Sequence, residues 1–280
     1  MSAVTTEQVI AGIKDLPAMP AVVSEILGSL GRESLSAEDL ARKLSCDQGL
    51  MAKVLRLANS PFFGVSRRVV SAQEAVAILG LRSIRSIVVA SAVVGAIKQP
   101  ADSVLDFHSF WRHSLATALC AELIAREVGQ SQELAFVSGL LHDVGRMALA
   151  LASPHSFALA QAYRDEHDCS LQDAESQALG LDHARLGACL AEHWKFPPEI
   201  VRAVAAHHSP DVDRGVSLAA VLSVSDNLVH ALDLVGDPRE IVSPMDSMAW
   251  FVLDLKDDQY MQIFERLPTQ LNEICTSLLT

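Results

Sequence analysis

The residues best suited to chemistry are histidines and aspartates that recur in order along the second half of the chain. His142 and Asp143 are adjacent at the end of an apolar stretch, and adjacent residues of a helix point about 100° apart. Such a pair converges on one ligand only beside a helix end, or else it serves two metal ions. Single histidines precede and follow the pair on separate predicted helices. The candidate metal ligands are His113, His142, Asp143, His183, His207, His208 and Asp226.

Imidazole and carboxylate donors of this kind suit a divalent transition metal such as Fe, Mn, Zn or Ni. Helical bundles build metal centres from inward side chains on facing helices. A carboxylate that bridges two cations is a known device for phosphoester hydrolysis. The ligand pattern therefore predicts a mononuclear or dinuclear metal centre and leaves open whether that centre is catalytic.

Each part of this set also has a purely structural interpretation. A buried histidine such as His142 can hydrogen-bond an adjacent carboxylate at a helix end without any metal. The pair His207-His208 could sit at a helix C-terminus, where the helix dipole favours imidazolium, and Asp226 could be a helix cap. The other histidines have no ordered pattern and are expected to be structural or on the surface. They are His108, His155, His167, His193 and His230.

Helical periodicity runs through almost every segment, and alternation with period two is absent apart from short runs such as 87–89. Ser36 and Ser71 are expected to cap helices over 37–44 and 72–79, with Gly80 ending the second. Asp182 is expected to cap a helix that reaches residue 194. The sequence thus predicts an all-α fold. The remaining predicted helices are 49–57, 111–128 ended by Gly129, 132–144 ended by Gly145, 199–208, 217–234 and 248–279.

Composition excludes several classes of protein. Half of the 280 residues are apolar, so the chain can fold around a core, and disorder is excluded. The net charge of −12 argues against a nucleic-acid or membrane-surface binder. The longest apolar stretch, 87–97, is about half the ~20 residues that a membrane span needs, and no secretory signal is visible. Five scattered cysteines favour reduced, buried thiols in a cytoplasmic protein.

The charge is unevenly distributed along the chain. Residues 42–98 carry nine basic and two acidic side chains, a local charge of +7. A solvated face, a dock for an acidic partner and a site for an anionic ligand would each account for it. Core packing explains the helix-turn-helix spacing of 40–57, with Gly49 in its turn, and nucleic-acid binding through residues 42–98 is a third, weaker hypothesis. The polar stretch 98–103 is the expected seam between an N-terminal subdomain (1–100) and a second domain (101–280).

Several stretches resemble one protein family. Residues 110–114 (FWRHS), 138–146 (SGLLHDVGR), 182–188 (DHARLGA) and 206–210 (AHHSP) are similar to HDOD domains, the HD-related output domains of bacterial signalling proteins. Residues 16–20 (LPAMP), 55–64 (LRLANSPFFG) and 75–81 (AVAILGL) are similar to the N-terminal signatures of that family. The resemblance covers about residues 10–235 and implies an N-terminal helical subdomain packed on an HD-like helical bundle.

The resemblance also implies a function. HDOD proteins are mostly regulatory outputs, such as those of response regulators, that bind other signalling proteins without hydrolysis. The oligomeric state is left open. A partner surface is expected at Asn59, Ser60, Pro61, Phe62, Arg67 and Arg68.

Departures from the related HD-GYP phosphodiesterases count against cyclic-di-GMP hydrolysis. Arg146 stands where those enzymes have lysine, Ser109 stands where some relatives have an acid for a third metal, and the Gly-Tyr-Pro signature is missing. The seven ligand positions are nevertheless filled. The first hypothesis is therefore a signalling module without turnover, and the alternative is a metal-dependent phosphohydrolase. In the alternative, Asp143 bridges two cations and Arg146 stabilises developing negative charge. The other ligands divide into His113, His142 and Asp226 on one cation and His183, His207 and His208 on the other.

Overall fold

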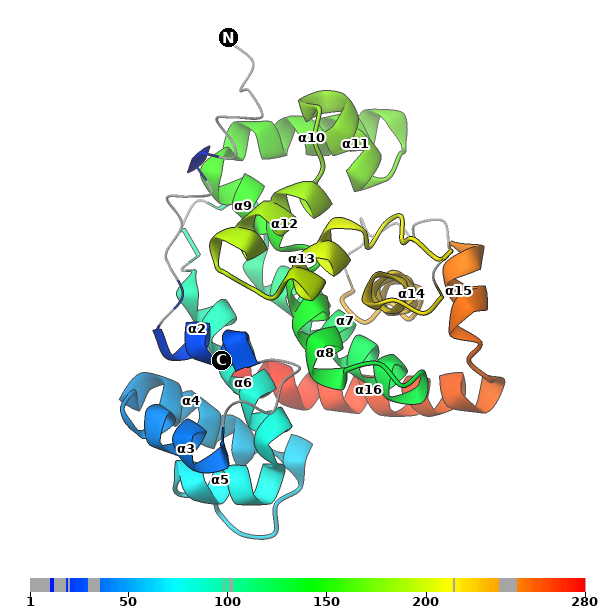
Figure 1. Ribbon diagram of the computed structural model, residues 1–280. Helices are drawn as coiled ribbons and strands as arrows, with labels where there is room; N and C mark the ends of the chain where they lie inside the picture. The colour runs from blue at the N-terminus through cyan, green and yellow to red at the C-terminus, as the bar shows by residue number, and fades with distance from the viewer. Residues whose placement is uncertain are drawn as a thin grey trace.

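The computed structural model describes residues 11–12, 19, 21–29, 36–97, 99–100, 103–213, 215–236 and 246–279. Within these ranges the regular structure is entirely helical, so the predicted all-α fold is confirmed. Figure 1 shows the second half of the chain as stacked helices, with the N-terminal helices packed against them at the lower left. Four residues of the first family signature, 16–18 and 20, lie outside the described part, as do residues 98, 101 and 102 of the expected seam.

The N-terminal helices begin where short polar side chains cap them. The hydroxyl of Ser36 accepts from the backbone N–H of Asp39, and that of Ser71 accepts from Glu74 N–H, so both predicted caps are confirmed. The turn after the first of these helices is Cys46-Asp47, so the expectation of a turn at Gly49 is wrong. The elements are α2 (Ala21–Ser29), α3 (Ala37–Ser45), α4 (Gln48–Ala58), a 3-10 turn η1 (Pro61–Phe63), α5 (Ala72–Leu79) and α6 (Leu81–Ala96).

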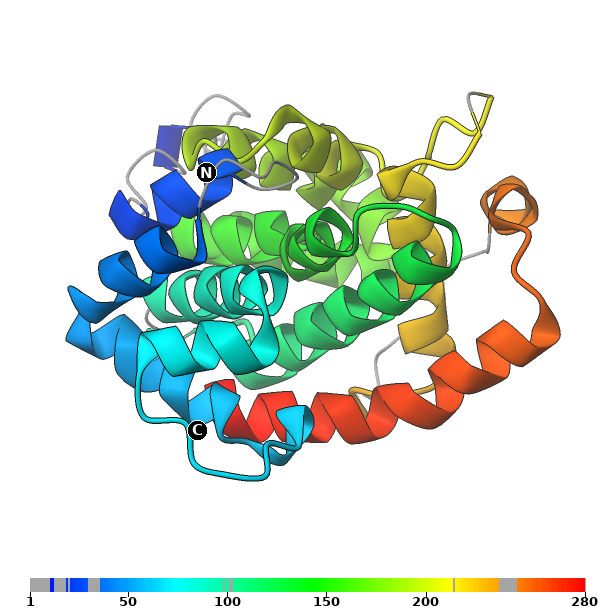
Figure 2. The same ribbon diagram turned by 60° about the horizontal axis from the view of Figure 1, so that its bottom comes forward.

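The second half forms the bundle that carries the candidate ligands. The long helix α7 packs along α8 in the middle of the molecule, and α16 runs beneath α7 and reaches α4 (Figures 1 and 2). The elements are α7 (Phe107–Glu127), α8 (Gln132–Leu141), α9 (Val144–Ala152), α10 (Pro154–His167), α11 (Leu171–Leu179), α12 (His183–His193), α13 (Pro198–Ala205), α14 (Leu218–Ala231), α15 (Ser247–Leu253) and α16 (Asp257–Leu278).

Several predicted boundaries are wrong, each for a local reason. The expected helix over 132–144 ends at Leu141, and Gly145 lies in the first turn of α9 instead of ending a helix. The expected helix over 199–208 ends at Ala205, which leaves the two following histidines in a turn. The expected helix over 248–279 is divided because Asp254 adopts a left-handed conformation, with φ of 45°.

One hydrophobic core runs through both halves of the described chain. It extends from α2 to α16, so apolar side chains of α6 and α7 belong to the same cluster. A buried ion pair joins Arg85 of α6 to Glu133 of α8, with Nε–Oε1 and Nη2–Oε2 distances of 2.6 and 2.9 Å. The two halves therefore share one interior. The predicted division into domains 1–100 and 101–280 stays a prediction.

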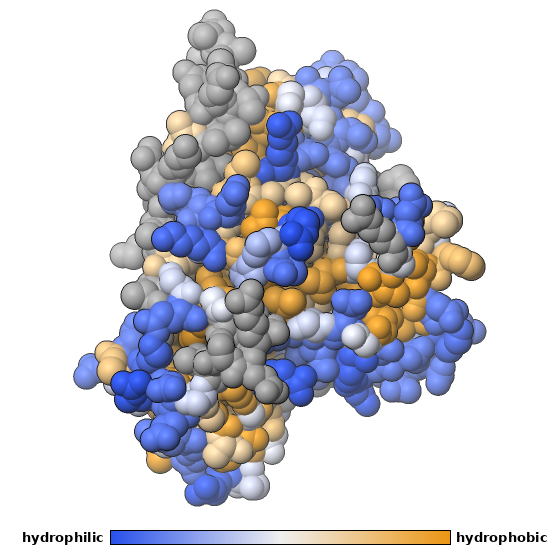
Figure 3. All heavy atoms as spheres, viewed as in Figure 1, coloured by the Kyte–Doolittle hydropathy of each residue, from blue (hydrophilic) through white to orange (hydrophobic). Residues whose placement is uncertain are grey.

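The stretch Gln132–Ala152, which comprises α8 and α9, is long and apolar enough to cross a membrane. However, 83% of the most apolar window is buried inside the protein, and a core helix pair has this property. Exposed apolar side chains gather elsewhere, around α15, where Phe251 is 78% and Met248 is 54% exposed (Figure 3).

All five cysteines are unpaired, as expected. Only Cys120 and Cys275 are buried, and Cys46 is exposed, so the expectation of buried thiols applies to two of the five.

Candidate metal centre

The centre is built around the break between α8 and α9. His142 is the C-cap of α8 and Asp143 is the N-cap of α9, so the two adjacent side chains leave the backbone at a helix end and turn toward the same space. Both residues are buried. The sequence-based prediction that a His-Asp pair converges only beside a helix end describes this arrangement.

Two glycines let the neighbouring helices come close enough to surround this break. A Cβ atom at Gly139 would lie 2.6 Å from Ala118 Cα in α7, and one at Gly145 would lie 1.9 Å from the carbonyl oxygen of His183 in α12. Both distances are far below van der Waals contact. Glycine at these two positions therefore brings α7 and α12 against the ends of α8 and α9.

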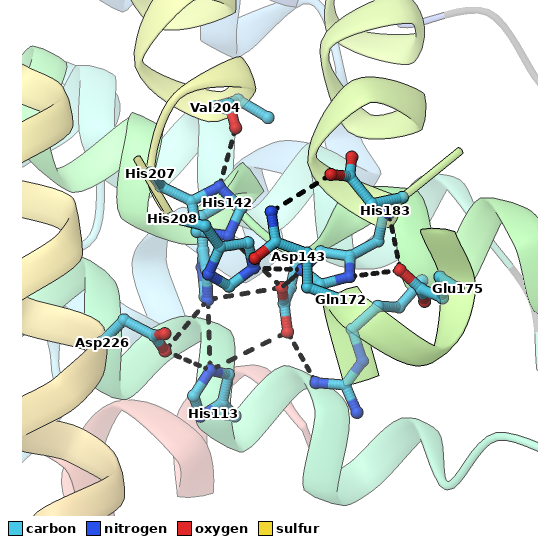
Figure 4. Close-up of polar contacts among 12 residues, drawn as sticks. His113, His142, Asp143, Gln172, Glu175, His183, Val204, His207, His208 and Asp226 are labelled. Atoms are coloured by element: carbon cyan, nitrogen blue, oxygen red, sulfur yellow. Dashed lines mark hydrogen bonds and ion pairs between the residues drawn. The ribbon is translucent and has the colours of Figure 1, made fainter. Parts of the chain in front are cut away.

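The seven predicted ligands meet in one cluster, shown in Figure 4. The two carboxylates divide the imidazoles between them. Asp226 Oδ1 lies 3.0 Å from His113 Nε2 and 3.4 Å from His142 Nε2. Asp143 Oδ1 lies 3.2 Å from His183 Nε2, 3.7 Å from His142 Nε2 and 3.9 Å from His207 Nε2. His208 joins the second group, with its Nε2 at 2.7 Å from His183 Nε2.

Backbone carbonyls fix how two of these imidazoles are protonated. His142 Nδ1 donates to Gly139 O at 2.7 Å, and His207 Nδ1 donates to Val204 O at 2.7 Å, because a carbonyl oxygen can only accept. In the neutral rings the Nε2 lone pairs therefore point into the cluster. His207 Nε2 is buried and has no hydrogen-bond partner among the described residues. An inward lone pair without a partner is what a metal ligand presents before the metal binds.

The spacing of the donor atoms also fits a cation. Nitrogen or oxygen ligands about 2.1 Å from one metal ion are about 3.0 to 3.4 Å apart in octahedral or tetrahedral coordination. The shortest separations in the cluster, from 2.7 to 3.4 Å, are close to this range. Two groups of donors have ligand atoms that all lie within 4.8 Å of one another, one made of His183, His207 and His208 and the other of His113, His142 and Asp143.

Burial and neighbouring charges shift the pKa values of the cluster in opposite directions. Burial, helped by the adjacent imidazoles, lowers the pKa of His207 to about 4 and that of His208 to about 2. Burial would also lower the pKa of His183, but Glu175 and Asp143 outweigh it and raise this pKa to about 10. Without metal, His183 is therefore protonated at neutral pH, and Asp143 and Asp226 raise the pKa of His142 as well, against the effect of burial.

The carboxylates of the centre are ionised. Burial alone would raise the pKa of Asp143, but His142, Arg146 and His183 hold it well below its usual value. Arg146 Nη1 donates to Asp143 Oδ2 at 2.6 Å from the adjacent turn of α9. For Asp226, His230, His113 and His142 likewise outweigh burial and keep the pKa far below its usual value. Two buried anions facing imidazoles are an electrostatic environment that attracts a cation.

The centre opens into a pocket of about 150 Å³. Polar side chains from α9, α10 and α11 line one part of it, including Arg146, Arg164 and Gln172. Apolar side chains also line the pocket, including Leu105, Phe110 and Phe157. A small ligand with an anionic group and an apolar body fits such a lining.

Two residues of the site were not in the predicted set. Glu175 in α11 is fully buried and accepts from the backbone N–H of His183 at 2.7 Å and from His183 Nδ1 at 2.6 Å. Nothing in the sequence marks it, because it lies eight residues before its partner on another helix. His230 was expected to be structural or on the surface, yet it lies 3.3 Å from Asp226 Oδ1. Its position four residues after Asp226 is the signal that could have found it.

The other four histidines without a pattern, His108, His155, His167 and His193, are exposed, as expected.

The predicted partner surface divides into inward and outward residues. Asn59 accepts from Val69 N–H and donates to Val69 O, so it clamps its own loop, and the hydroxyl of Ser60 donates to Leu57 O. Pro61, Arg67 and Arg68 are exposed, and Arg67 pairs with Glu74. The side chain of Phe62 lies outside the described part of the structure. A partner surface here stays a prediction that depends on the three exposed residues.

In this all-α bundle the residues of the series H…HD…H…HH…D come together at one centre. That combination defines a protein of the HD superfamily. Residues 16–210 match the HDOD domain, and the chain therefore belongs to the HDOD family. Asp226 and His230, which complete the centre from α14, lie after the matched segment.

Solved structures agree with this assignment. The chain is 27% identical to an HDOD domain protein of unknown function from Geobacter sulfurreducens, with a TM-score of 0.79 and coverage of 97% of both chains. It is 29% identical to a protein from Shewanella amazonensis named as a candidate phosphohydrolase, with a TM-score of 0.76 and coverage of 97% of this chain and 98% of that one.

Curated relatives match over shorter parts of their length. An uncharacterized protein of Treponema pallidum (strain Nichols) is 26% identical over 199 residues, which are 70% of this chain and 38% of that protein. Ribonuclease Y of Helicobacter pylori (strain J99) is 30% identical over 110 residues, which are 39% of this chain and 16% of the ribonuclease. The chain thus spans well under half the length of these relatives.

Proposed function

We propose that this chain is a signalling module whose His/Asp centre binds divalent transition-metal ions and whose adjoining pocket binds a phosphate ester. Its output is contact with other signalling proteins, without catalytic turnover. When bound, the cations supply Lewis acidity toward phosphate oxygens. The residues that would hold them are the seven predicted ligands: His113, His142, Asp143, His183, His207, His208 and Asp226.

The observation that carries metal binding is the buried Nε2 of His207. Val204 O fixes the ring so that this nitrogen faces the cluster, where no described residue hydrogen-bonds it. Burying a polar atom without a partner costs about 1 to 3 kcal/mol. A cation at this point satisfies that atom together with the nitrogens of His183 and His208.

The pocket supports a phosphate-bearing ligand. Arg146 and Arg164 bring two guanidinium groups to its lining, and a guanidinium binds phosphate through two parallel hydrogen bonds. The net charge of −12 gives no long-range attraction for an anion, so binding depends on these local groups.

Metal content tests the first part of the proposal. The purified chain is stripped with a chelator and titrated with Mn²⁺ or Zn²⁺ by calorimetry, and bound metal is counted by mass spectrometry. We expect two cations per chain and a higher Tm with metal, since a ligand at 100 times its Kd stabilises by about 2.7 kcal/mol. His207→Gln loses one cation, whereas the exposed control His155→Gln keeps both. A wild-type chain without bound metal, or a His207→Gln variant that binds like the wild type, contradicts the proposal.

The absence of turnover is tested with the same metal-loaded protein. One observation favours a catalytically silent centre: Arg146 donates to Asp143 Oδ2 at 2.6 Å, so one oxygen of this carboxylate is already engaged by a positive charge of the protein. We expect phosphate esters such as bis(4-nitrophenyl) phosphate to bind without being hydrolysed. Metal-dependent release of nitrophenolate that Asp143→Ala abolishes, in a variant with an unchanged circular dichroism spectrum, refutes this part.

Such turnover would establish the second candidate, a metal-dependent phosphohydrolase. Its support is the complete ligand set beside an open pocket and the similarity to the Shewanella protein and to ribonuclease Y. In that reaction His113, His142 and Asp226 would hold one cation and His183, His207 and His208 the other. Arg146 would stabilise negative charge on the phosphoryl oxygens from its place in the pocket lining.

A further inference from the structure

A third group of donor atoms lies between α7 and α14. His113 on α7 faces Asp226 and His230, which are four residues apart on one face of α14. His230 Nε2 lies 3.3 Å from Asp226 Oδ1, and the His113 and His230 ring centres are 4.7 Å apart. The three donor atoms lie within 4.8 Å of one another, and all three side chains line the open pocket.

We propose that His230 is a metal ligand, and that His113, Asp226 and His230 hold a cation of their own, apart from the one at His183, His207 and His208. This inference rests on the proposed function, since it assigns an additional ligand to the same centre. The site takes a divalent transition metal, because its donors are two imidazole nitrogens and one carboxylate oxygen.

Helix geometry makes the α14 pair a natural chelate. Residues four apart on a helix are neighbours on one face, and paired ligands at this spacing hold zinc on the helices of metalloproteases. Asp226 Oδ1 is contacted by His113 Nε2 at 3.0 Å and by His230 Nε2 at 3.3 Å. Both separations match the spacing of about 3.0 to 3.4 Å between ligands that share one cation.

The site lies at the wall of the pocket, as do His183 and His208 of the other group. The side chain of His230 is 15% exposed, whereas that of His207 is fully buried. Three protein ligands at the wall of a pocket leave coordination positions open, as in sites that bind an exogenous ligand, whereas structural zinc sites close all four. The α7–α14 cation therefore keeps coordination positions that the phosphate group of a ligand in the pocket can occupy.

His230 has a simpler alternative role, which is to donate a hydrogen bond to Asp226. Two variants separate the roles. His230→Gln keeps an N–H donor at the end of a side chain of similar size but removes a strong metal ligand. His230→Glu replaces the imidazole with another ligand that manganese accepts. The control is His193→Gln, on the exposed end of α12.

The experiment is a calorimetric titration of each chelator-stripped variant with Mn²⁺, with the bound manganese counted by electron paramagnetic resonance. We expect two cations in the wild type and in His193→Gln. In His230→Gln the affinity for one cation falls at least about tenfold while the other is retained. His230→Glu recovers most of the lost affinity. The His207→Gln variant is expected to bind one cation. Adding His230→Gln to that variant lowers the affinity for this cation.

Other outcomes overturn the inference in distinguishable ways. If His230→Gln binds two cations as tightly as the wild type, His230 only hydrogen-bonds Asp226, and the proposed function stands without the new ligand. If His230→Gln and His230→Glu are equally weakened, the residue is structural. If the wild type binds no manganese, the proposed function and this inference both fail.

Discussion

At the scale of single residues, the centre depends on groups that orient the ligands as much as on the ligands themselves. Glu175 accepts two hydrogen bonds from His183, one from the backbone and one from Nδ1. The ring is thereby held with Nε2 toward Asp143. The negative charge of Glu175 also makes Nε2 a stronger electron-pair donor to a metal ion. Glu175 is therefore a positioning residue that acts through His183.

Replacing Glu175 with glutamine is expected to weaken metal binding about 10- to 100-fold, because the amide keeps the size of the side chain but loses its charge. The affinity is measured by Zn²⁺ titration of the chelator-stripped protein. Glu166→Gln, on the exposed end of α10, serves as the control and is expected to bind as the wild type does. Equal affinities in all three proteins would show that the charge of Glu175 does not reach the metal.

The same contact predicts how the stability of the metal-free protein depends on pH. The pKa of His183 is raised from 6.5 to about 10 in the folded chain. A base whose pKa is raised by folding contributes its full stabilisation below the unfolded value and loses it as the pH rises through the folded value. We therefore expect the Tm of the chelator-treated wild type to fall between pH 7 and 10. Glu175→Gln should show a shallower fall, and parallel Tm curves for the two proteins would contradict this assignment.

Local signals made much of the site predictable. The caps at Ser36, Ser71 and Asp182 follow from side chains that bond their own helix ends, and the order of the histidines follows from the chain. His230 and Glu175 were missed for different reasons. The spacing of His230 from Asp226 was visible in the sequence, whereas Glu175 meets His183 only through the packing of α11 against α12.

At the scale of elements, close helix packing positions the His-Asp pair. The sequence pattern assigned Gly145 the usual role of a helix terminator, but the residue lies inside α9 beside α12. This error could not be avoided from local information, because the reason for glycine is an atom of a helix some forty residues away. The break at His142 supplies the helix end that the pattern attributed to glycine.

Gly145→Ala is accordingly expected to destabilise the protein by about 1 to 3 kcal/mol or more, since the added Cβ would overlap His183 O. Displacement of α12 would also move His183, so metal affinity should fall with stability. Gly49→Ala, at an exposed helical position with room for the methyl group, is expected to stabilise by about 0.5 to 1 kcal/mol. Urea unfolding monitored by circular dichroism measures both. Equally small changes in the free energy of unfolding for Gly145→Ala and Gly49→Ala would mean that α9 and α12 move apart without a loss of stability.

At the scale of the whole molecule, α8 connects the centre to the N-terminal helices. Its first turn carries Glu133, which pairs with Arg85 of α6, and its C-cap is His142 of the centre. A shift of α8 on metal binding would therefore reach α6 through one rigid element. Neither the pairing nor this path was predictable, since 48 residues separate the two charges and the local charge of +7 suggested a solvated face.

The Arg85–Glu133 pair tests whether the two halves depend on each other. Removing the Glu133 carboxylate takes a buried counter-charge away from Arg85, so Glu133→Gln is expected to cost about 3 to 5 kcal/mol. The double variant Arg85→Met/Glu133→Leu removes both charges and should recover most of that loss. Asp39→Asn, which breaks the exposed pair with Arg42, should change the stability far less, because solvent screens that pair. The same double variant, Arg85→Met/Glu133→Leu, also tests whether α8 carries the effect of metal binding to α6. If it does, this variant binds metal normally but loses the change that metal causes in the amide hydrogen exchange of α6. An unchanged exchange response in α6 would show that the path runs elsewhere.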